Sequence, residues 1–253
     1  MTLHGPDTIK MRKYIYSLLD LRKASSLLDI GCGDGYDLHR IGQMAGKEAR
    51  LIGIDTSSEA IDKAVSYTGE DSRYSFEVAT LDETLPFETE TLDIVYSMNF
   101  LECIVNKDTL IKDIHRVLRP GGQVVFAHFD WDSQIINGMD KPLMRKLVHA
   151  FSDWKQPWMM DCDPWMGRRL RGTFHRSGLF DGAIASYVLT NTDYAPEYYG
   201  FQRIKDMGAL VRHGMVPQQD YDQFLEEIRS LAQAGEYFYS ITMYVYIGEK
   251  KGG

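Results

Sequence analysis

The chain has 253 residues, of which 44% are hydrophobic and 25% charged, and its formal net charge is −8. This length accommodates one α/β domain with a cap, and this composition is typical of a soluble globular protein. An acidic chain offers no broad surface for phosphate groups, so we expect no nucleic-acid substrate.

The cysteines and the start of the chain indicate the compartment. Three cysteines without Cys-x-x-Cys spacing favour neither a disulfide framework nor a zinc site, so we expect no metal. The first residues lack the charged and apolar pattern of a secretion signal, and no apolar run has the length of a membrane span. We therefore expect a cytoplasmic protein, and we expect it to be a monomer or a homodimer.

The first predicted element is a helix that Asp7 or Thr8 can cap and that carries Ile9, Ile15, Leu18 and Leu19 on one face. The segment Leu27-Leu28-Asp29-Ile30-Gly31-Cys32-Gly33-Asp34-Gly35 follows, and it reads as a buried strand that ends before a glycine-rich loop and a helix. Glycines at alternate positions allow a tight turn and a close approach to a ligand. This arrangement is typical of nucleotide-like ligand sites. The spacing differs from that of dinucleotide sites, which argues against a nicotinamide-dependent oxidoreductase.

A second apolar strand, 51–54, ends in Asp55, where a carboxylate can accept hydrogen bonds from both hydroxyls of a ribose. The next three residues, 56–58, can cap a helix that continues through Ile61, Ala64 and Val65. Two further strands are predicted over 92–97 and 123–129.

Five motifs in this order resemble the class I S-adenosylmethionine-dependent methyltransferases, in the small-molecule branch related to ubiquinone and menaquinone methyltransferases. The resemblance covers roughly residues 25 to 130. The motifs are Asp29-x-Gly31-x-Gly33-x-Gly35, Asp55, Leu85-Pro86-Phe87, Leu92-Asp93-Ile94-Val95 and Leu118-Arg119-Pro120-Gly121-Gly122.

The resemblance implies an α/β fold: a Rossmann-like, seven-stranded, mostly parallel sheet whose last strand is antiparallel, with helices on both faces and a helical cap. It also implies S-adenosyl-L-methionine as cofactor. The residues expected to bind it are Asp29, Gly31, Cys32, Gly33, Asp55, Thr56, Leu81, Asp82 and Asn99. Two positions depart from the family: the place of the adenine-binding acid is taken by Leu81, one residue before Asp82, and Cys103 replaces a common histidine.

We expect residues 1–253 to form a single methyltransferase domain. Its core would comprise about 22–130, 173–190 and 236–249, and the cap would comprise insertions at about 131–172 and 191–235. The first insertion holds every tryptophan of the chain, namely Trp131, Trp154, Trp158 and Trp165. Such a segment reads either as a cap over the sheet's carboxyl edge or as a satellite core.

Candidate catalytic residues end the fifth strand. His128, Asp130 and Asp132 share parity, so in an extended chain they face one way, with Trp131 opposite. They could bind an amine or remove a proton from an acceptor; alternatively, one acid caps a helix and the histidine packs on the sheet. Candidate substrate-binding residues are Trp131, Trp158, Tyr198 and Arg203, and adjacent Tyr198 and Tyr199 cannot share a helical face.

Methyl transfer from a sulfonium requires close and aligned reactants rather than a metal or a covalent intermediate. The sequence thus favours a methyltransferase acting on a small molecule, with an oxygen or nitrogen acceptor rather than carbon. An enzyme that uses the cofactor structurally while its cap guides a cyclisation or rearrangement is the alternative, because one fold hosts many functions.

Overall fold

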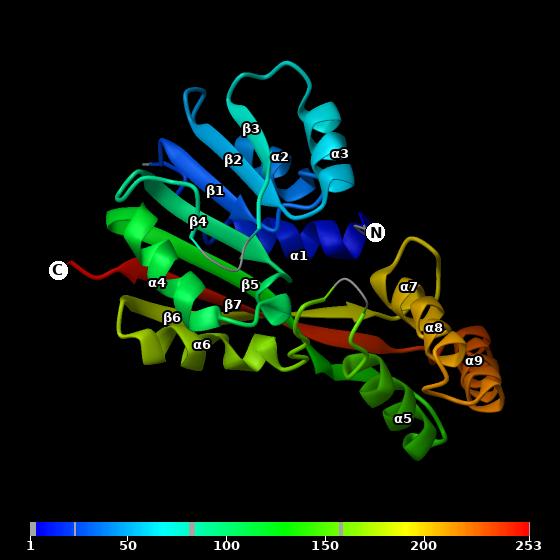
Figure 1. The fold of residues 1–253 in the computed structure, drawn as a ribbon. Coiled ribbons are helices and arrows are strands. Elements are labelled where there is room, and N and C mark those ends of the chain that lie inside the picture. Colours follow the sequence, from blue (N-terminus) through cyan, green and yellow to red (C-terminus); the bar gives the residue numbers. More distant parts are fainter. Residues whose placement is uncertain (1–3, 23, 81–83, 157–158, 253) are drawn as a thin grey trace.

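The computed structural model describes residues 4–22, 24–80, 84–156 and 159–252. Its centre is a seven-stranded sheet in the order β3-β2-β1-β4-β5-β7-β6 (Figure 1). The strands are β1 Ser26–Ile30, β2 Arg50–Asp55, β3 Tyr74–Val78, β4 Leu92–Met98, β5 Leu118–Ile136, β6 Phe180–Asn191 and β7 Tyr239–Lys250. Strand β7 runs antiparallel to β5 and β6, and the pairs from β3 to β5 are parallel. The predicted fold class is confirmed.

Helices cover both faces of the sheet. They are α1 Pro6–Tyr16, α2 Tyr36–Gly42, α3 Ser58–Thr68, α4 Lys107–Val117, α5 Lys141–Ser152, α6 Met166–Ser177, α7 Tyr199–Asp206, α8 Ala209–Arg212 and α9 Gln218–Gln233, with a 3-10 helix, η1, at Leu101–Cys103. Because successive strand residues point to opposite faces, Leu27 packs in one buried cluster with Met11 of α1, and Leu28 packs in another with Ile114 of α4.

Helix α1 is fastened to distant parts of the chain. It begins at Pro6, one residue before the predicted cap, and Gly5 precedes it. The Asp7 carboxylate accepts hydrogen bonds from Asn191 Nδ2 at 2.8 Å and from the backbone N–H of Tyr199 at 2.9 Å. Arg12 forms an ion pair with Asp37 of α2 at 2.8 Å. These contacts fix the helix beside the ends of β6 and α7.

Helix α3 begins as predicted: its N-cap, Ser57, accepts a hydrogen bond from Ala60 N at 3.2 Å. The predicted buried face is wrong at one position. Ile61 and Ala64 are buried, whereas Val65 is half exposed, since it lies one position beyond the narrow stripe that meets the sheet.

Strand β5 is longer than predicted. It continues past Phe129, passes an irregularity after Asp130, and pairs again with β7, where Ile135 faces Ser240 and Ile136 faces Tyr239. Residues 131–136, which the sequence assigned to the first insertion, therefore belong to the sheet. The alternation that would reveal a strand is weak there, because polar and apolar side chains are mixed on both sides.

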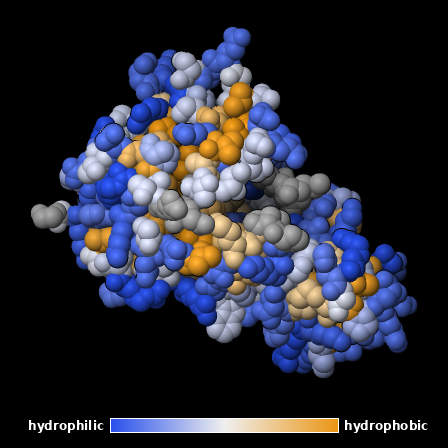
Figure 2. Space-filling view, viewed as in Figure 1, coloured by the Kyte–Doolittle hydropathy of each residue, from blue (hydrophilic) through white to orange (hydrophobic). Residues whose placement is uncertain are grey.

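Four helices, α5, α7, α8 and α9, gather beyond the ends of β5, β6 and β7 (Figure 1); we call them the cap helices. Leu147 of α5 and Phe224 of α9 are fully buried, and they belong to the same cluster as Met11 of α1. The cap helices thus share a continuous core with the sheet. No described helix is long and apolar enough to cross a membrane, and the face seen in Figure 2 is mostly hydrophilic.

Candidate functional site

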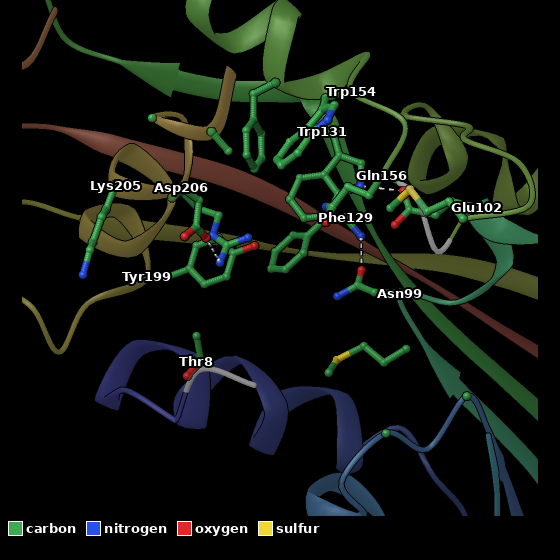
Figure 3. A pocket seen from close by; sticks show the side chains of 18 of the residues that line it. Thr8, Asn99, Glu102, Phe129, Trp131, Trp154, Gln156, Tyr199, Lys205 and Asp206 are labelled. Atoms are coloured by element: carbon green, nitrogen blue, oxygen red, sulfur yellow. Dashed lines mark hydrogen bonds and ion pairs between the residues drawn. The ribbon is translucent and has the colours of Figure 1, made fainter. Parts of the chain in front are cut away.

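A cavity of about 1010 Å³ lies at the carboxyl ends of β1, β4 and β5. Its walls come from the glycine loop, from Met11 on α1, from Asn99 and Glu102 after β4, and from residues of the cap helices. Figure 3 shows the side chains of β5, α1 and α7 around the opening. Open α/β sheets bind their ligands at this edge, so we take this cavity as the candidate site.

The glycine loop meets the cavity with its backbone. Gly31, Gly33 and Gly35 all have positive φ angles, of 74°, 53° and 76°. A Cβ on Gly31 would lie 2.7 Å from Phe100, and one on Gly35 would lie 2.8 Å from Ala64. Protein atoms therefore already fill the space beside these two glycines. A Cβ on Gly33 would meet no described atom within 4 Å. Gly33 is therefore the point where a ligand can approach the backbone.

Asp55, at the end of the neighbouring strand β2, forms a hydrogen bond with the glycine loop. Its carboxylate accepts hydrogen bonds from the backbone N–H groups of Gly33 and Ser57, each at 2.9 Å. The side chain is half-buried at the tip of β2, and Thr56 beside it is exposed. Asp55 thus fixes the position of Gly33 through a hydrogen bond that joins the two sequence motifs.

Replacing Asp55 by alanine should weaken S-adenosylmethionine binding at least tenfold. Loss of a charge-assisted acceptor costs ~1.5–3 kcal/mol, and the loop also loses the bond to Gly33 N. Because both backbone donors can then bind water, we expect the melting temperature of the ligand-free protein to fall by only a few degrees. Calorimetric titration of variant and parent measures the effect, and equal affinities would contradict this role.

Two further predicted cofactor residues lie at this edge. Asp29 is buried at the end of β1, and burial, together with Asp37 and Asp55, raises the pKa of its carboxyl well above its usual range. Cys32 lines the cavity, and burial raises the pKa of its thiol, which keeps it protonated and unsuited to a nucleophilic role. Leu81 and Asp82 fall outside the described residues.

Asn99 joins β4 to β5 at the cavity. Its φ is +54°, a left-handed conformation that asparagine tolerates better than most residues. Its backbone N–H donates to Ala127 O at 2.9 Å, and its side-chain oxygen accepts from Phe129 N at 3.0 Å (Figure 3). Asn99 therefore fixes the position of Phe129 relative to the glycine loop.

Three rings of the cavity form what we call the aromatic wall: Phe129, Trp131 and Tyr199. The ring centroid of Phe129 lies 5.5 Å from that of Trp131 and 5.1 Å from that of Tyr199. The guanidinium of Arg203 lies 4.9 Å from the centroid of Tyr199, at one end of the wall. At the other end, Trp131 Nε1 donates to Glu102 Oε2 at 2.6 Å (Figure 3).

The structure places the predicted catalytic trio on the side of β5 that faces away from the cavity. His128, Asp130 and Asp132 do share one side, but they do not line the cavity: Asp130 pairs with Arg168 of α6, and Asp132 accepts from Trp165 Nε1. The alternate residues Phe129 and Trp131 face the cavity instead. His128 is buried behind the wall, where its Nδ1 lies 2.7 Å from Phe129 O and its Nε2 lies 3.8 Å from Glu102 Oε1.

Of the predicted substrate-binding residues, Trp131 and Arg203 line the cavity. Tyr198, the N-cap of α7, does not, whereas Tyr199, the first residue of the helix, does. Trp158 lies outside the described residues. Sequence reasoning missed Glu102, although an acid just after the fourth strand was a usable signal. Within the described ranges, no three His, Cys, Asp or Glu side chains are grouped to hold a metal ion.

The chain is similar to known proteins in sequence and in fold. A family described as a methyltransferase domain matches residues 21–178. An uncharacterized 37.1 kDa protein in transposon TN4556 of Streptomyces fradiae is 27% identical over 91% of this chain and 64% of its own length. The 27-O-demethylrifamycin SV methyltransferase of Amycolatopsis mediterranei is 30% identical over 48% of this chain and 45% of its own length. The chain thus spans less than two thirds of these relatives.

Among solved structures, YcgJ protein from Bacillus subtilis superposes with a TM-score of 0.65 at 16% identity, over 97% of this chain and 100% of that one. At this identity the likeness shows the fold. Together with the match to more than half of the chain, it leads to one conclusion. The chain belongs to the methyltransferase domain family, has the class I S-adenosylmethionine-dependent fold, and uses S-adenosylmethionine as its cofactor.

Proposed function

We propose that this protein transfers the methyl group of S-adenosylmethionine to a small-molecule acceptor, with oxygen or nitrogen rather than carbon as the receiving atom. The observation that carries the proposal is a shared cavity, in which Gly33 of the cofactor loop and Trp131 of the aromatic wall line the same space. A cofactor on the loop and an acceptor against the wall would share that space, and a displacement reaction requires this proximity.

The residues present fit the cofactor. Open space above Gly33 admits a ligand against the backbone, and Asp55 beside it is a carboxylate suited to ribose hydroxyls. Asn99 and Cys32 complete this side of the cavity. When bound, the sulfonium supplies an activated methyl group. The chain contributes by aligning the acceptor, which is worth ~7–11 kcal/mol in well-oriented reactions, and by excluding water.

The polarity of the cavity supports an oxygen or nitrogen acceptor. Oxygen and nitrogen nucleophiles often carry a proton that must leave, and Glu102 places a proton acceptor at the aromatic wall. The name of the rifamycin relative points to an oxygen acceptor in that protein. The net charge of −8 and the enclosed aromatic wall favour a small molecule over a nucleic acid.

The test is methyl transfer itself. The purified protein is incubated with S-adenosylmethionine labelled in its methyl group and with fractionated metabolite extracts. We expect label in an extractable product and an equal amount of S-adenosylhomocysteine. A new product without S-adenosylhomocysteine would favour the rearrangement alternative. Folded protein that binds neither S-adenosylmethionine nor S-adenosylhomocysteine in calorimetry would overturn the proposal.

A further inference from the structure

Glu102 is a buried carboxylate in the wall of the cavity. Its residue is 3% exposed, and it lies on η1 immediately after β4. Burial raises the pKa of its carboxyl, although His128 and the hydrogen bond from Trp131 act in the opposite direction. An ionised carboxylate removed from water is costly unless a cation and hydrogen-bond donors compensate it. The Trp131 indole supplies one such donor, to Oε2.

The cations around Glu102 are already occupied or too distant. Lys107 Nζ lies 3.0 Å from Asp161 Oδ2, and Arg203 pairs with Asp206. Among the described residues, the one basic nitrogen within 4.0 Å of the carboxylate is His128 Nε2, at 3.8 Å, which is too long for a hydrogen bond. That nitrogen is itself buried without a hydrogen-bond partner in the described part of the chain. Within the described ranges, Oε1 of Glu102 therefore has no cation at hydrogen-bond distance.

Other titratable groups near the carboxylate do not change this balance. They are Asp163, which is an acid, and the neutral side chains Cys103, Cys162 and Tyr199; burial raises the pKa of Cys162 to about 11 and that of Tyr199 to about 12. The aromatic wall adds electron-rich ring faces, which attract cations. The place beside Glu102 thus combines a buried carboxyl group with aromatic surface.

We infer that the acceptor is an amine that enters as an ammonium ion, and that Glu102 binds this ion against the aromatic wall and takes the proton that the nitrogen loses before methylation. The inference rests on the proposed methyltransferase function and names its substrate class. An ammonium ion supplies the cation that Oε1 lacks, and its N–H groups supply donors.

The proton balance is complete. The ammonium gives one proton to the Glu102 carboxylate, and the freed nitrogen lone pair forms the new N–C bond to the methyl carbon as the S–C bond breaks. The S–C electron pair stays on sulfur, which leaves S-adenosylhomocysteine. The protonated Glu102 then releases its proton to solvent, so each turnover yields a methylated ammonium ion and one proton.

The test uses the full chain saturated with S-adenosylhomocysteine and two probes of one shape, tryptamine and tryptophol. Their rings and ethyl chains are the same, and one carries an ammonium where the other carries a hydroxyl. We expect tryptamine to bind at least tenfold more tightly in calorimetry. At mildly acidic pH its binding should release protons, because a bound cation lowers the pKa of Glu102. Titrations in buffers of different ionisation enthalpy measure this release.

Glu102→Gln should remove both the preference for tryptamine and the proton release, while the affinity for S-adenosylhomocysteine stays within about twofold. Asp132→Asn is the matched control, since Asp132 is an acid of the same region that contacts Trp165 outside the cavity; it should keep both effects. Glu102→Asp retains the charge and should retain part of the preference, which provides a second variant if the glutamine variant does not fold.

Failure of this inference is distinct from failure of the proposed function. If S-adenosylhomocysteine does not bind the folded protein, the methyltransferase proposal itself is wrong. If it binds but tryptophol binds as tightly as tryptamine, or neither probe binds at millimolar concentration, the amine inference is overturned. Preservation of the preference in folded Glu102→Gln would overturn it as well.

Discussion

Gly33→Val should abolish the binding of S-adenosylmethionine and S-adenosylhomocysteine while the protein remains folded. The φ angle of Gly33 is +53°, a conformation that costs an L-residue roughly 1–2 kcal/mol. The new side chain would extend into open space, so the fold meets no clash, but that space is the ligand's. We expect a loss of affinity greater than about 100-fold, or ~2.7 kcal/mol, in calorimetric titrations.

Gly178→Val is the control for backbone strain. Gly178 follows α6, has a φ of +69°, and its Cβ would also meet no described atom within 4 Å. It is exposed and does not line the cavity. This variant should lose a similar amount of stability and keep its cofactor affinity. If both variants lose binding equally, strain rather than occupation of the ligand's space is the cause; if Gly33→Val binds normally, the loop assignment fails.

Asp130→Asn should destabilise the fold without weakening cofactor binding. The Asp130 side chain is fully buried and accepts hydrogen bonds from the guanidinium of Arg168 and from its backbone N–H, in the first turn of α6. Loss of the charge removes charge-assisted bonds and a favourable interaction with the helix N-terminus. Because Arg168 is half exposed and can turn to water, we expect a cost of about 1.5–3 kcal/mol, or roughly 3–12 °C in melting temperature.

A double-mutant cycle tests whether Arg168 is the residue through which Asp130 stabilises the fold. Arg168→Met should destabilise more than Asp130→Asn, since it leaves the buried Asp130 carboxylate without its cation, and the double variant should cost less than the sum of the two. Scanning calorimetry gives the stabilities, and titration with S-adenosylhomocysteine should show affinities within about twofold of the parent. A stable Asp130→Asn protein with lost turnover would return Asp130 to a catalytic role.

Most of the fold was predictable because its signals are local. The strand, glycine loop and following helix at 27–44 are read from hydrophobic runs and from glycine positions, and the bond between Gly33 N and Asp55 joins two motifs that the sequence marks separately. The antiparallel last strand came from the family resemblance, and β7 confirms it.

The side of β5 that meets the cavity could not be predicted in the same way. The alternation of side chains along a strand correctly predicts that Asp130 and Asp132 lie opposite Trp131. It does not predict which of the two sides faces the cavity. That depends on Arg168 and Trp165, which are more than thirty residues away and attract the two acids toward α6. Glu102 was missed for a related reason: its importance arises from contact with Trp131, which lies 29 residues later in the chain.

The two segments predicted as insertions, 131–172 and 191–235, are not equally suited to exchange in a chimeric enzyme. Asn191 and Tyr239 are direct partners in the sheet, so the segment 192–238 leaves and re-enters the ladder at adjoining points. A replacement of this segment should therefore leave the pairing of β6 with β7 unchanged. Residues 131–136 are part of β5, and a junction there would divide a strand. A chimeric enzyme designed for a new acceptor should therefore keep β5 whole and exchange α7 to α9 as one piece.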